Sequence, residues 1–457
     1  MSIKISVSHF TAFVSVLLSA AIALFDPLAL GASSAAMALT VLVIGFWASG
    51  VVAEYLTALM FFTVAMLFAI APAEVTFAGF SAGATWLIFS GLVIGVGVNS
   101  SGLGERIARR VSSLFGRSYR RIIFGIILVA LVLGFVMPSS MGRVVLMMPI
   151  AIALAKELGY EPTTRGFTGI VLAAGFSCFF MPYGILPANI PNVVLLGIAE
   201  GMYDFSPIYG DWFALHFPLI SAFKAVIMWG LIVVLFPASS RPLTSVQQSS
   251  PMTQAEWRLS AILVAALLGW ATDFIHHIPP AAIGMVAALL FMTPGLGNVA
   301  KKDFGNINFS VLFYVAAILG IGAMVNHSGL GPIVAEQLMA ILPLEPGQSF
   351  VNFMSIALTG VAVGTFTAMP GIPIIMTPIA EQFAQGSGFS LDAVLMIQAL
   401  SFSTPYLVYQ SAPIVVAMGM ANVRLADGTK LIASLAAVTI LVIFPLDYLW
   451  WGVLGWI

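Results

Sequence analysis

Charged residues are scarce in this chain. Of 457 residues, 8% are Asp, Glu, Lys or Arg and 60% are hydrophobic, and the mean hydropathy is +1.07. Soluble domains have about a quarter charged residues, so water cannot be the main solvent of this chain. The formal net charge of −1 gives no basis for binding nucleic acid, and we expect no such partner. The expected partner is the lipid bilayer.

Cysteine and the common catalytic motifs are also missing. The single cysteine, Cys178, excludes intrachain disulfides and a thiolate metal cluster. The sequence has no Walker A loop, nucleophile elbow or zinc signature, and its five histidines are scattered. We therefore expect no enzyme activity, no ATP-driven pump, no cofactor and no structural metal.

Long apolar segments are abundant. A membrane-spanning helix needs about 20 mostly apolar residues, and eleven segments meet this requirement. They are residues 10–25, 34–50, 55–72, 84–100, 166–181, 213–236, 258–272, 279–294, 309–326, 390–404 and 431–450. The sequence predicts an all-α polytopic membrane protein with about 11 transmembrane helices. Residues 1–33 resemble a signal peptide, but we predict that they form the first transmembrane helix.

Two further apolar stretches, residues 122–156 and 350–386, are interrupted midway by proline and glycine. The interruptions read Pro138-Ser-Ser-Met-Gly142 and Pro370-Gly-Ile-Pro373. Unpaired backbone groups at membrane depth are tolerated only where they face protein or a watery cavity. Each stretch is therefore predicted to be a re-entrant hairpin whose tip faces a binding site.

The positive charges predict the orientation in the membrane, since Lys and Arg concentrate in cytoplasmic loops. With a cytoplasmic N-terminus and eleven crossings, the loops on the outer side contain no Lys or Arg. Only Arg143 and Lys224 lie outside the cytoplasmic segments. We predict a multi-pass protein of the cell inner (plasma) membrane, with a periplasmic or extracellular C-terminus.

The chain contains an internal duplication on either side of a polar linker, residues 239–257. Phe89–Gly104 matches Ala316–Gly331 at 9 of 16 positions, 316 − 89 = 227 residues apart. The hairpin prolines Pro149 and Pro378 follow at nearly the same offset, and so do two Pro-Tyr segments that begin at residues 182 and 405. We predict one repeat in residues 34–238 and a second in 258–457.

The two repeats have opposite orientations. Residues 106–121, after the first Ser-Gly-Leu-Gly motif, form a basic cytoplasmic cluster, whereas residues 332–346 after the second copy have no Lys or Arg. Inverted repeats with discontinuous helices are typical of secondary transporters with alternating access, whose site lies at the membrane midplane between the repeats.

These motifs resemble the divalent anion:sodium symporter family of the ion transporter superfamily. The resemblance extends from Ala35 to the C-terminus. It includes the region of Glu54, the Trp-Leu-Ile-Phe segment at residues 86–89, both Ser-Gly-Leu-Gly motifs, both hairpins and both proline-rich breaks. It implies a homodimer of eleven-helix protomers that carries dicarboxylates, citrate or sulfate by an elevator mechanism. It also implies that substrate and sodium meet at the two hairpin tips and at two Thr-Pro-Pro-Asn-like helix breaks, of which the first here keeps Pro191-Asn192 and the second reads Ser411-Ala412-Pro413 without asparagine.

At these tips the sequence departs from the family pattern of two Ser-Asn-Thr motifs. The first reads Ser139-Ser140-Met141 and the second reads Ala368-Met369-Pro370. Sodium requires oxygen ligands, and methionine and proline side chains supply none. Coupling to Na⁺ therefore does not carry over, which leaves proton symport, exchange, or a sodium site made of backbone carbonyls.

Arg143, beside the first tip, is the most unusual residue because an arginine at membrane depth costs at least about 2.5–3.5 kcal/mol without compensation. It could present its fork of donors to a carboxylate or sulfonate, or act as a fixed cation where the family has sodium. It could instead pair with Glu54 or Glu381, or extend to the cytoplasm.

The predicted substrate-binding residues lie at the hairpin tips and the helix breaks. They are Ser139, Ser140, Met141, Gly142, Arg143, Asn189, Pro191, Asn192, Thr365, Thr367, Ala368, Met369, Pro370, Gly371, Gln410, Ser411, Ala412 and Pro413. Many of the polar ones could instead cap helices or satisfy unwound backbone. Asn99 and Asn326 occur at equivalent positions of both repeats, which favours a scaffold role.

Acidic residues in or near apolar segments are the candidates for proton coupling, namely Glu54, Glu381 and Asp447. Glu54 could equally be a solvated cap at the cytoplasmic end of its helix, and we expect Asp447, near the outer end of the last helix, to be solvated. We expect a secondary transporter of a small organic anion. The rivals are a cation/proton antiporter or oxyanion exporter of the same superfamily, a non-transporting sensor or subunit, and an anion channel.

Overall fold

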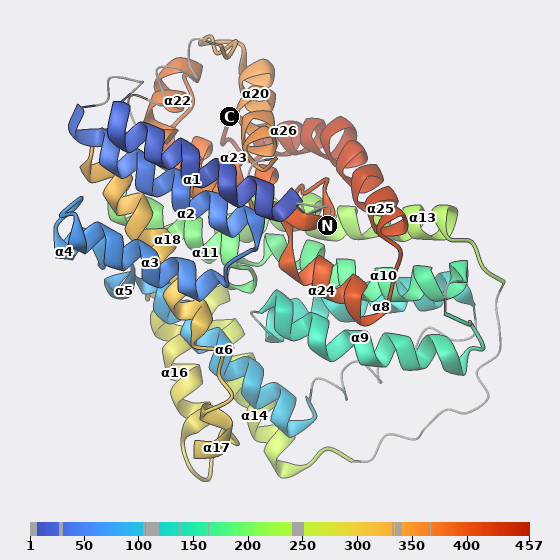
Figure 1. Cartoon of the computed structure of the whole chain (residues 1–457). Helices are drawn as coiled ribbons and strands as arrows, with labels where there is room; N and C mark the ends of the chain where they lie inside the picture. Colours follow the sequence, from blue (N-terminus) through green and yellow to red (C-terminus); the bar gives the residue numbers. More distant parts are fainter. Residues whose placement is uncertain are drawn as a thin grey trace, which may run out of the picture.

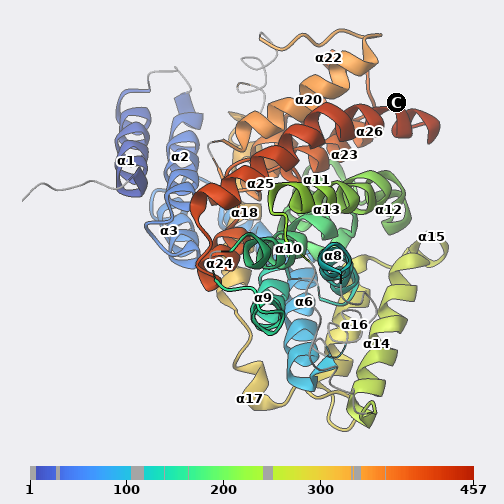
Figure 2. The same ribbon diagram turned by 90° about the vertical axis from the view of Figure 1, so that its right-hand side faces the viewer.

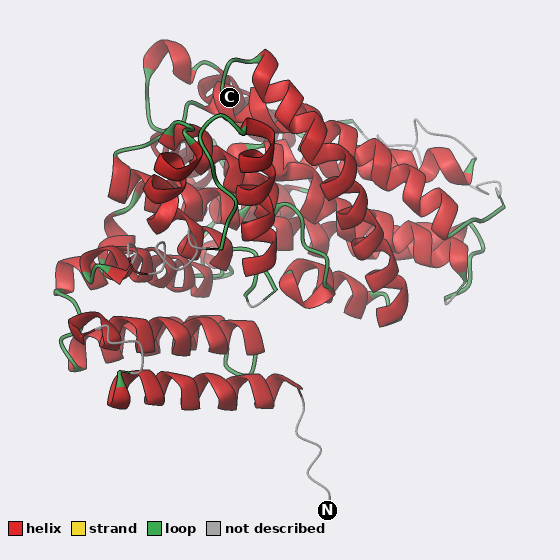
Figure 3. Cartoon of the chain, turned by 90° about the horizontal axis from the view of Figure 1, so that it is seen from above, coloured by secondary structure: helices red, strands yellow, loops and turns green. Residues whose placement is uncertain are grey.

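The computed structural model describes residues 7–26, 31–103, 106, 118–137, 139–162, 164–239, 251–330, 333, 341–365 and 367–457. Over these residues the chain is helical and contains no strand (Figure 3). Five helical segments are long and apolar enough to cross a membrane, at residues 119–136, 165–184, 209–235, 310–327 and 425–453. The predicted all-α membrane fold is confirmed, and the count of eleven crossings stays a prediction.

One group of helices contains both Ser-Gly-Leu-Gly segments, and we call it the SGLG group. Its members are α1 (Val7–Phe25), η1 (Gly31–Ser33), α2 (Ser34–Ser49), α3 (Glu54–Leu67), α4 (Ala73–Thr76), α5 (Ala78–Ser81), α6 (Gly83–Ser101), α14 (Gln254–Ala271), α15 (Asp273–His276), α16 (Pro280–Met292), α17 (Lys301–Phe304) and α18 (Ser310–His327). Helix α1 packs on α2 at one edge of the molecule, α16 packs on α6, and α18 packs on α3 (Figures 1 and 2).

The remaining helices contain both hairpins and form the hairpin group. In the first repeat they are α8 (Tyr119–Val136), α9 (Ser140–Glu157), α10 (Arg165–Phe180), η2 (Met181–Gly184), η3 (Leu186–Ala188), α11 (Ile190–Tyr203), α12 (Tyr209–His216), η4 (Phe217–Phe223) and α13 (Lys224–Leu235). In the second they are α20 (Ser349–Val363), α21 (Gly371–Met376), η5 (Thr377–Ile379), α22 (Ala380–Ser387), α23 (Leu391–Phe402), η6 (Val408–Gln410), α24 (Ala412–Met420), α25 (Leu425–Val438), η7 (Thr439–Ile443) and α26 (Phe444–Val453).

The two hairpins turn where the sequence predicts. Helices α8 and α9 pack against each other on either side of the first tip, and α20 packs on α21 across the second. The returning helices begin at Ser140 and Gly371, as expected from the Ser and Gly-Pro signals. Whether the hairpins are re-entrant in a bilayer stays a prediction.

Each repeat also contains a helix break. Hydroxyl caps start the preceding helices in both halves, since Thr164 accepts the Phe167 N–H at 3.4 Å and Ser390 accepts the Ala393 N–H at 3.1 Å. Helix α10 then stops at Phe180 and α23 at Phe402. A short 3₁₀ turn, η3 or η6, precedes the next helix in each case.

Helices α12 to α13 and α25 to α26 each contain a π-helical segment, η4 and η7. Such segments are rare and are often found at functional sites. A Phe-Pro-Leu sequence begins η4 at residues 217–219 and another directly follows η7 at residues 444–446, and the two are 444 − 217 = 227 residues apart. This is the offset of the Ser-Gly-Leu-Gly repeat, so each repeat has a π-helical segment next to or overlapping its Phe-Pro-Leu sequence.

Several predicted features lie wholly or partly outside the described residues. They are Pro138, residues 107–117 of the basic cluster, residues 240–250 of the linker and the side chain of Asn99.

Candidate functional site

Arg143 lies in the first turn of α9 and is fully buried. Its Nε donates to the Cys178 carbonyl at 3.0 Å and its Nη1 to the Met137 carbonyl. Its Nη2 donates to Ser140 Oγ, the Ala188 carbonyl and Asn189 Oδ1 at 3.0, 3.1 and 3.2 Å. The guanidinium therefore ties the first hairpin tip to α10 and to the break before α11.

This geometry selects among the four roles expected for Arg143. Complete burial excludes a side chain that extends to the cytoplasm. Arg143 forms no ion pair with Glu54 or Glu381, since the acceptors of its hydrogen bonds are Cys178, Met137, Ser140, Ala188 and Asn189. Five oxygens from three chain segments surround the guanidinium, which is the arrangement expected of a fixed cation in an oxygen cage.

The serines of the first tip have structural partners. Ser139 is the N-cap of α9 and accepts the Gly142 N–H at 3.1 Å. Ser140 Oγ accepts from Arg143 and donates to Asn189 Oδ1. Met141 and Gly142 are partly buried in the same turn. The capping role that the sequence left open for Ser139 is thus present in the structure.

At the second tip, Gln410 connects the hairpin tip to the helix break by hydrogen bonds, as Arg143 does at the first tip. Its Oε1 accepts the N–H groups of Tyr406 and Leu407, each at 2.8 Å, and its Nε2 donates to the Gly364 carbonyl. The Met369 N–H donates to the Gln410 carbonyl at 3.1 Å. In each repeat, one long polar side chain therefore joins the hairpin tip to the helix break.

The remaining residues of the second tip fill the turn. Thr365 Oγ1 is hydrogen-bonded to the Tyr406 hydroxyl, and Thr367 is buried. A Cβ on Gly371 would lie 1.9 Å from Thr367 Oγ1, so only glycine fits beside this threonine. Ala368 and Pro370 are partly buried and offer no side-chain donor.

Asn192 satisfies the unwound backbone of the first break. Its Nδ2 lies within 3.0 to 3.3 Å of the carbonyls of Tyr183, Ile185 and Leu186. Pro191 and Pro413 occupy the first turns of α11 and α24, where their missing N–H costs nothing, and Ala412 begins α24. These residues shape the breaks.

Asn189 and Ser411, by contrast, keep unused donors at the ends of the two breaks. Each is the N-cap of the following helix, α11 or α24, yet neither side chain caps it. Asn189 Nδ2 and Ser411 Oγ are buried without a hydrogen-bond partner. A helix N-terminus with an unused buried donor is suited to an anion, and the two repeats each supply one.

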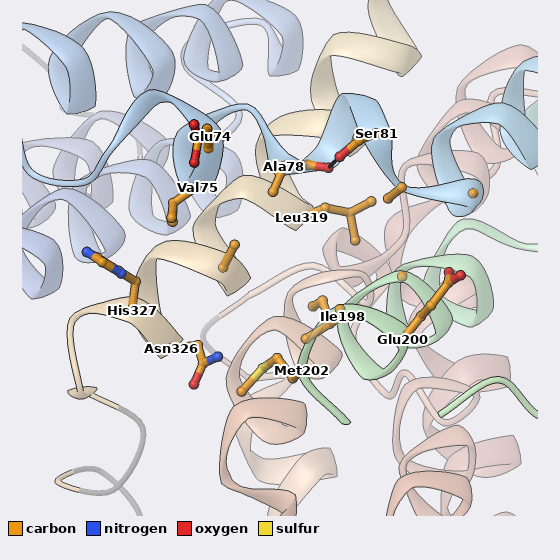
Figure 4. A pocket seen from close by; sticks show the side chains of 15 residues that line it. Glu74, Val75, Ala78, Ser81, Ile198, Glu200, Met202, Leu319, Asn326 and His327 are labelled. Carbon is orange, nitrogen blue, oxygen red and sulfur yellow. Dashed lines mark hydrogen bonds between the residues drawn. The ribbon is translucent and has the colours of Figure 1, made fainter. Parts of the chain in front are cut away.

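A cavity of about 490 Å³ lies between α4, α5 and α6 on one side and α11 and α18 on the other (Figure 4). Glu74, Glu200, Asn326 and His327 line it, together with apolar residues, and none of the predicted substrate-binding residues does. Four of these helices, α4, α5, α6 and α18, belong to the SGLG group, and α11 belongs to the hairpin group. The two carboxylates of the cavity disfavour an anion.

The three proton-coupling candidates differ in burial. Glu54, the first residue of α3, and Glu381, in the first turn of α22, are both exposed on the protein surface, so the protein encloses neither of them. Asp447 is fully buried, and both of its carboxylate oxygens lack a hydrogen-bond partner. The expectation that Asp447 is solvated is therefore wrong, because α26 packs on α12 and α20 and this side chain is buried within the protein.

Three residues that we did not predict as site residues support the breaks, and a fourth, His216, lies buried in α12. Lys224 is fully buried and donates to the Ser403 carbonyl at 2.6 Å. Ser221 accepts the Gly184 N–H at 3.0 Å. His216 is fully buried, and Cys178 supplies a carbonyl to Arg143. The repeated Phe-Pro-Leu sequence was the available signal for the first three, since it marks both π-helical segments.

Comparison with protein families places nearly the whole chain in one group. Residues 7–457 match the family described as the sodium:sulfate symporter transmembrane region. The inner membrane protein YbhI of Escherichia coli K12 is 25% identical over 400 residues, covering 83% of this chain and 82% of YbhI.

Two further relatives are matched over less of their length. The L-tartrate/succinate antiporter of Escherichia coli K12 is 25% identical over 285 residues, covering 58% of either chain. A Cupriavidus necator membrane protein is 25% identical over 326 residues, covering 64% of this chain and 63% of its own.

Among solved structures, the YdaH transporter of Alcanivorax borkumensis has a TM-score of 0.54 at 15% identity, covering 83% of this chain and 87% of its own. MtrF of Neisseria gonorrhoeae, described with a class of antimetabolite efflux pumps, has a TM-score of 0.53 at 14% identity, covering 82% of either chain. At these identities, the likeness shows the fold alone.

Proposed function

Because the chain belongs to the sodium:sulfate symporter family of membrane anion transporters, we propose that it carries a small organic anion of the dicarboxylate type across the inner membrane. The name of the tartrate/succinate antiporter supports a dicarboxylate over sulfate. The hairpin group would carry the anion past the SGLG group in an elevator motion, in a dimer. The observation that carries the proposal is the pair of unused buried donors, Asn189 Nδ2 and Ser411 Oγ.

The binding chemistry follows from the duplicated breaks. Each free donor stands at the N-terminus of a helix, where the peptide dipoles add a partial positive charge. A dicarboxylate has two anionic groups, so its two ends match two such donors. Arg143 adds a positive charge behind the first break without contacting the anion, since its nitrogens are already bonded to protein oxygens.

Sodium coupling has little support at either tip. The oxygens that could hold a cation at the first tip are engaged by Arg143, and the second tip exposes no side-chain oxygen at positions 368 to 370. We therefore propose that transport is driven by protons or by exchange. No resident cofactor is required.

The test is uptake of labelled succinate and tartrate into liposomes containing the wild type, Ser411→Ala or Ser390→Ala. Ser411 Oγ has no protein partner, so its loss should weaken substrate affinity and leave the unfolding temperature unchanged. Ser390 is a bonded N-cap of α23, so its loss should lower the unfolding temperature and leave affinity unchanged. Equal affinity in the two variants would contradict the proposed site. Binding without uptake or exchange in the wild type would favour a sensor.

A further inference from the structure

The hairpin group contains a second buried polar cluster that the anion site does not use. Lys224 begins α13 directly after the π-helical η4, and Asp447 lies in the first turn of α26 directly after the π-helical η7. Both side chains are fully buried. They come from opposite repeats, which meet where α26 packs on α12 and the Trp450 indole N–H donates to the Ala214 carbonyl at 2.8 Å.

Lys224 and Asp447 are nevertheless not in contact as an ion pair. No nitrogen-to-oxygen distance between them falls within 4.0 Å. The Lys224 Nζ instead donates to the Ser403 carbonyl at 2.6 Å and lies 5.2 Å from the centre of the Phe180 ring. Asp447 has no hydrogen bond on either oxygen.

A buried carboxylate without any hydrogen bond is unfavourable as an ion. Two arrangements remove the cost. In one, a proton binds to a carboxylate oxygen and neutralises Asp447. In the other, the ammonium of Lys224 leaves Ser403 and pairs with the ionised carboxylate. The arrangement seen, with Lys224 on Ser403 and Asp447 unpaired, corresponds to the first.

Ser403 gives this choice a consequence for the anion site. It is the first residue of the second break, whose last residue is Ser411. The π-helical segment η4, directly before Lys224, also holds the first break, since Ser221 of η4 accepts the Gly184 N–H. Movement of Lys224 from Ser403 to Asp447 would therefore release a carbonyl of the second break and leave the first break held.

We propose that Asp447 and Lys224 form a proton-binding site that controls the second helix break. A proton that binds to Asp447 leaves Lys224 on the Ser403 carbonyl. When this proton leaves Asp447 as H⁺, the ammonium of Lys224 exchanges its hydrogen bond to Ser403 for an ion pair with the carboxylate. Apart from the O–H bond of Asp447, no covalent bond breaks. The link to uptake rests on the proposed transport function, whereas proton binding itself does not.

Few other titratable groups lie near this site. Helix α20 and η7 have none, and Tyr448 of α26 is hydrogen-bonded to Ser349. The buried groups are His216 and Tyr209 on α12, of which His216 lies against Trp451, Tyr183 on η2 and Cys178 on α10, while Asp211 at the start of α12 is exposed. The termini of α8, α10 and α25 carry Tyr119, Arg120, Arg121, Arg165, Arg424, Asp427 and Lys430. The Tyr119 hydroxyl donates to the Phe236 carbonyl, and Arg424, Asp427 and Lys430 line a pocket together with Phe236. Phe236 lies roughly 18 Å along the axis of α13 from Lys224.

Proton binding is tested first on the purified full-length protein by infrared titration of the protonated carboxyl band. The wild type should show a carboxyl that loses its proton with rising pH, and Asp447→Asn should lack this band. Asp392→Asn, the same change at an exposed carboxylate, should retain it. Lys224→Gln removes the nearby cation, so the carboxyl should keep its proton to higher pH. A band that persists in Asp447→Asn, or no shift in Lys224→Gln, would overturn the proposal.

Coupling is tested in liposomes with and without an inward proton gradient. The gradient should accelerate succinate uptake by the wild type and by Asp392→Asn. In Asp447→Asn, uptake should be the same with and without the gradient, while exchange against internal succinate persists. Stimulation that survives in Asp447→Asn but disappears in His216→Gln would overturn the assignment. Absence of uptake and exchange in the wild type, with the infrared result intact, would refute the transport function and leave the proton site standing.

Discussion

Arg143 and Asn189 are joined by a hydrogen bond of 3.2 Å between Nη2 and Oδ1, which connects the first hairpin tip to the N-terminus of α11. Asn189 thereby has its oxygen held by the protein and its nitrogen free. An arginine that looked in the sequence like a substrate ligand acts in the structure as a positioning residue for an amide. The anion chemistry falls to that amide and to Ser411.

Removal of the Arg143 charge should destabilise the protein and create a cation requirement. Arg143→Ala removes a donor from five oxygens, of which only Asn189 Oδ1 keeps another donor, Ser140, at a cost of roughly 3 kcal/mol or more in the free energy of unfolding. A small cation that enters the empty cage would recover part of this loss. Thermal unfolding in sodium and in choline chloride measures both effects.

The wild type is the control for this experiment, and its unfolding temperature should be the same in the two salts. An Arg143→Ala variant that is equally stable in sodium and in choline would show that the cage closes without its cation.

Gln410 should be the counterpart of Arg143 in the second repeat. Gln410→Glu keeps the acceptor for Tyr406 and Leu407 but loses the donor to the Gly364 carbonyl, whereas Gln410→Leu loses both. With about 1 kcal/mol per hydrogen bond, we expect the order of stability to be wild type, Gln410→Glu, Gln410→Leu. Unfolding curves in detergent check this order, and equal stability of all three would refute the tether.

Gly184 should tolerate no side chain. A Cβ at this position would lie 2.5 Å from Phe217 Cα, and backbone cannot move aside as a flexible side chain can. Gly184→Ala should therefore separate η2 from η4, with lower yield of folded protein and a lower unfolding temperature. Gly210→Ala in α12 is the control, since nothing lies within 4 Å of the added methyl group and alanine favours a helix. Similar behaviour of the two variants would contradict the close approach.

Acid should weaken the contact between Arg106 and Glu256. Hydrogen bonds from Arg106, at 2.7 and 3.0 Å, lower the pKa of Glu256 to about 2 from its ordinary value of 4.5. Because the pKa is lower in the folded state, the stabilisation is complete above about pH 4.5 and is lost as the pH falls toward 2. The stability difference between wild type and Glu256→Gln should be constant above this window and shrink within it. A difference independent of pH from 5 to 2 would contradict the assignment.

The sequence predicted the features that depend on the backbone of a few neighbouring residues. Proline and glycine predicted both hairpin tips and both breaks, since these residues change which backbone conformations and hydrogen bonds are possible. The repeat predicted that the halves share this architecture, and the structure has matching breaks before Ile190 and Ala412.

Partners across the fold were beyond the reach of the sequence. Arg143 was expected to bond to a carboxylate, but it bonds mainly to main-chain carbonyls, which every residue has and no sequence distinguishes. The burial of Asp447 depends on the packing of α26 against α12, and hydropathy places a residue along a helix without telling which side faces the protein.

The buried position of Arg143 also has an electrical consequence. A dissolved ion can stay behind when a carrier returns empty, but a charge attached by a side chain must travel in both directions. Each elementary charge that crosses the whole field is worth about 2.3 kcal/mol per 100 mV. If the hairpin group moves as proposed, the membrane potential acts on the empty carrier through Arg143, and the resting voltage of the cell would favour one of its two orientations before any substrate binds.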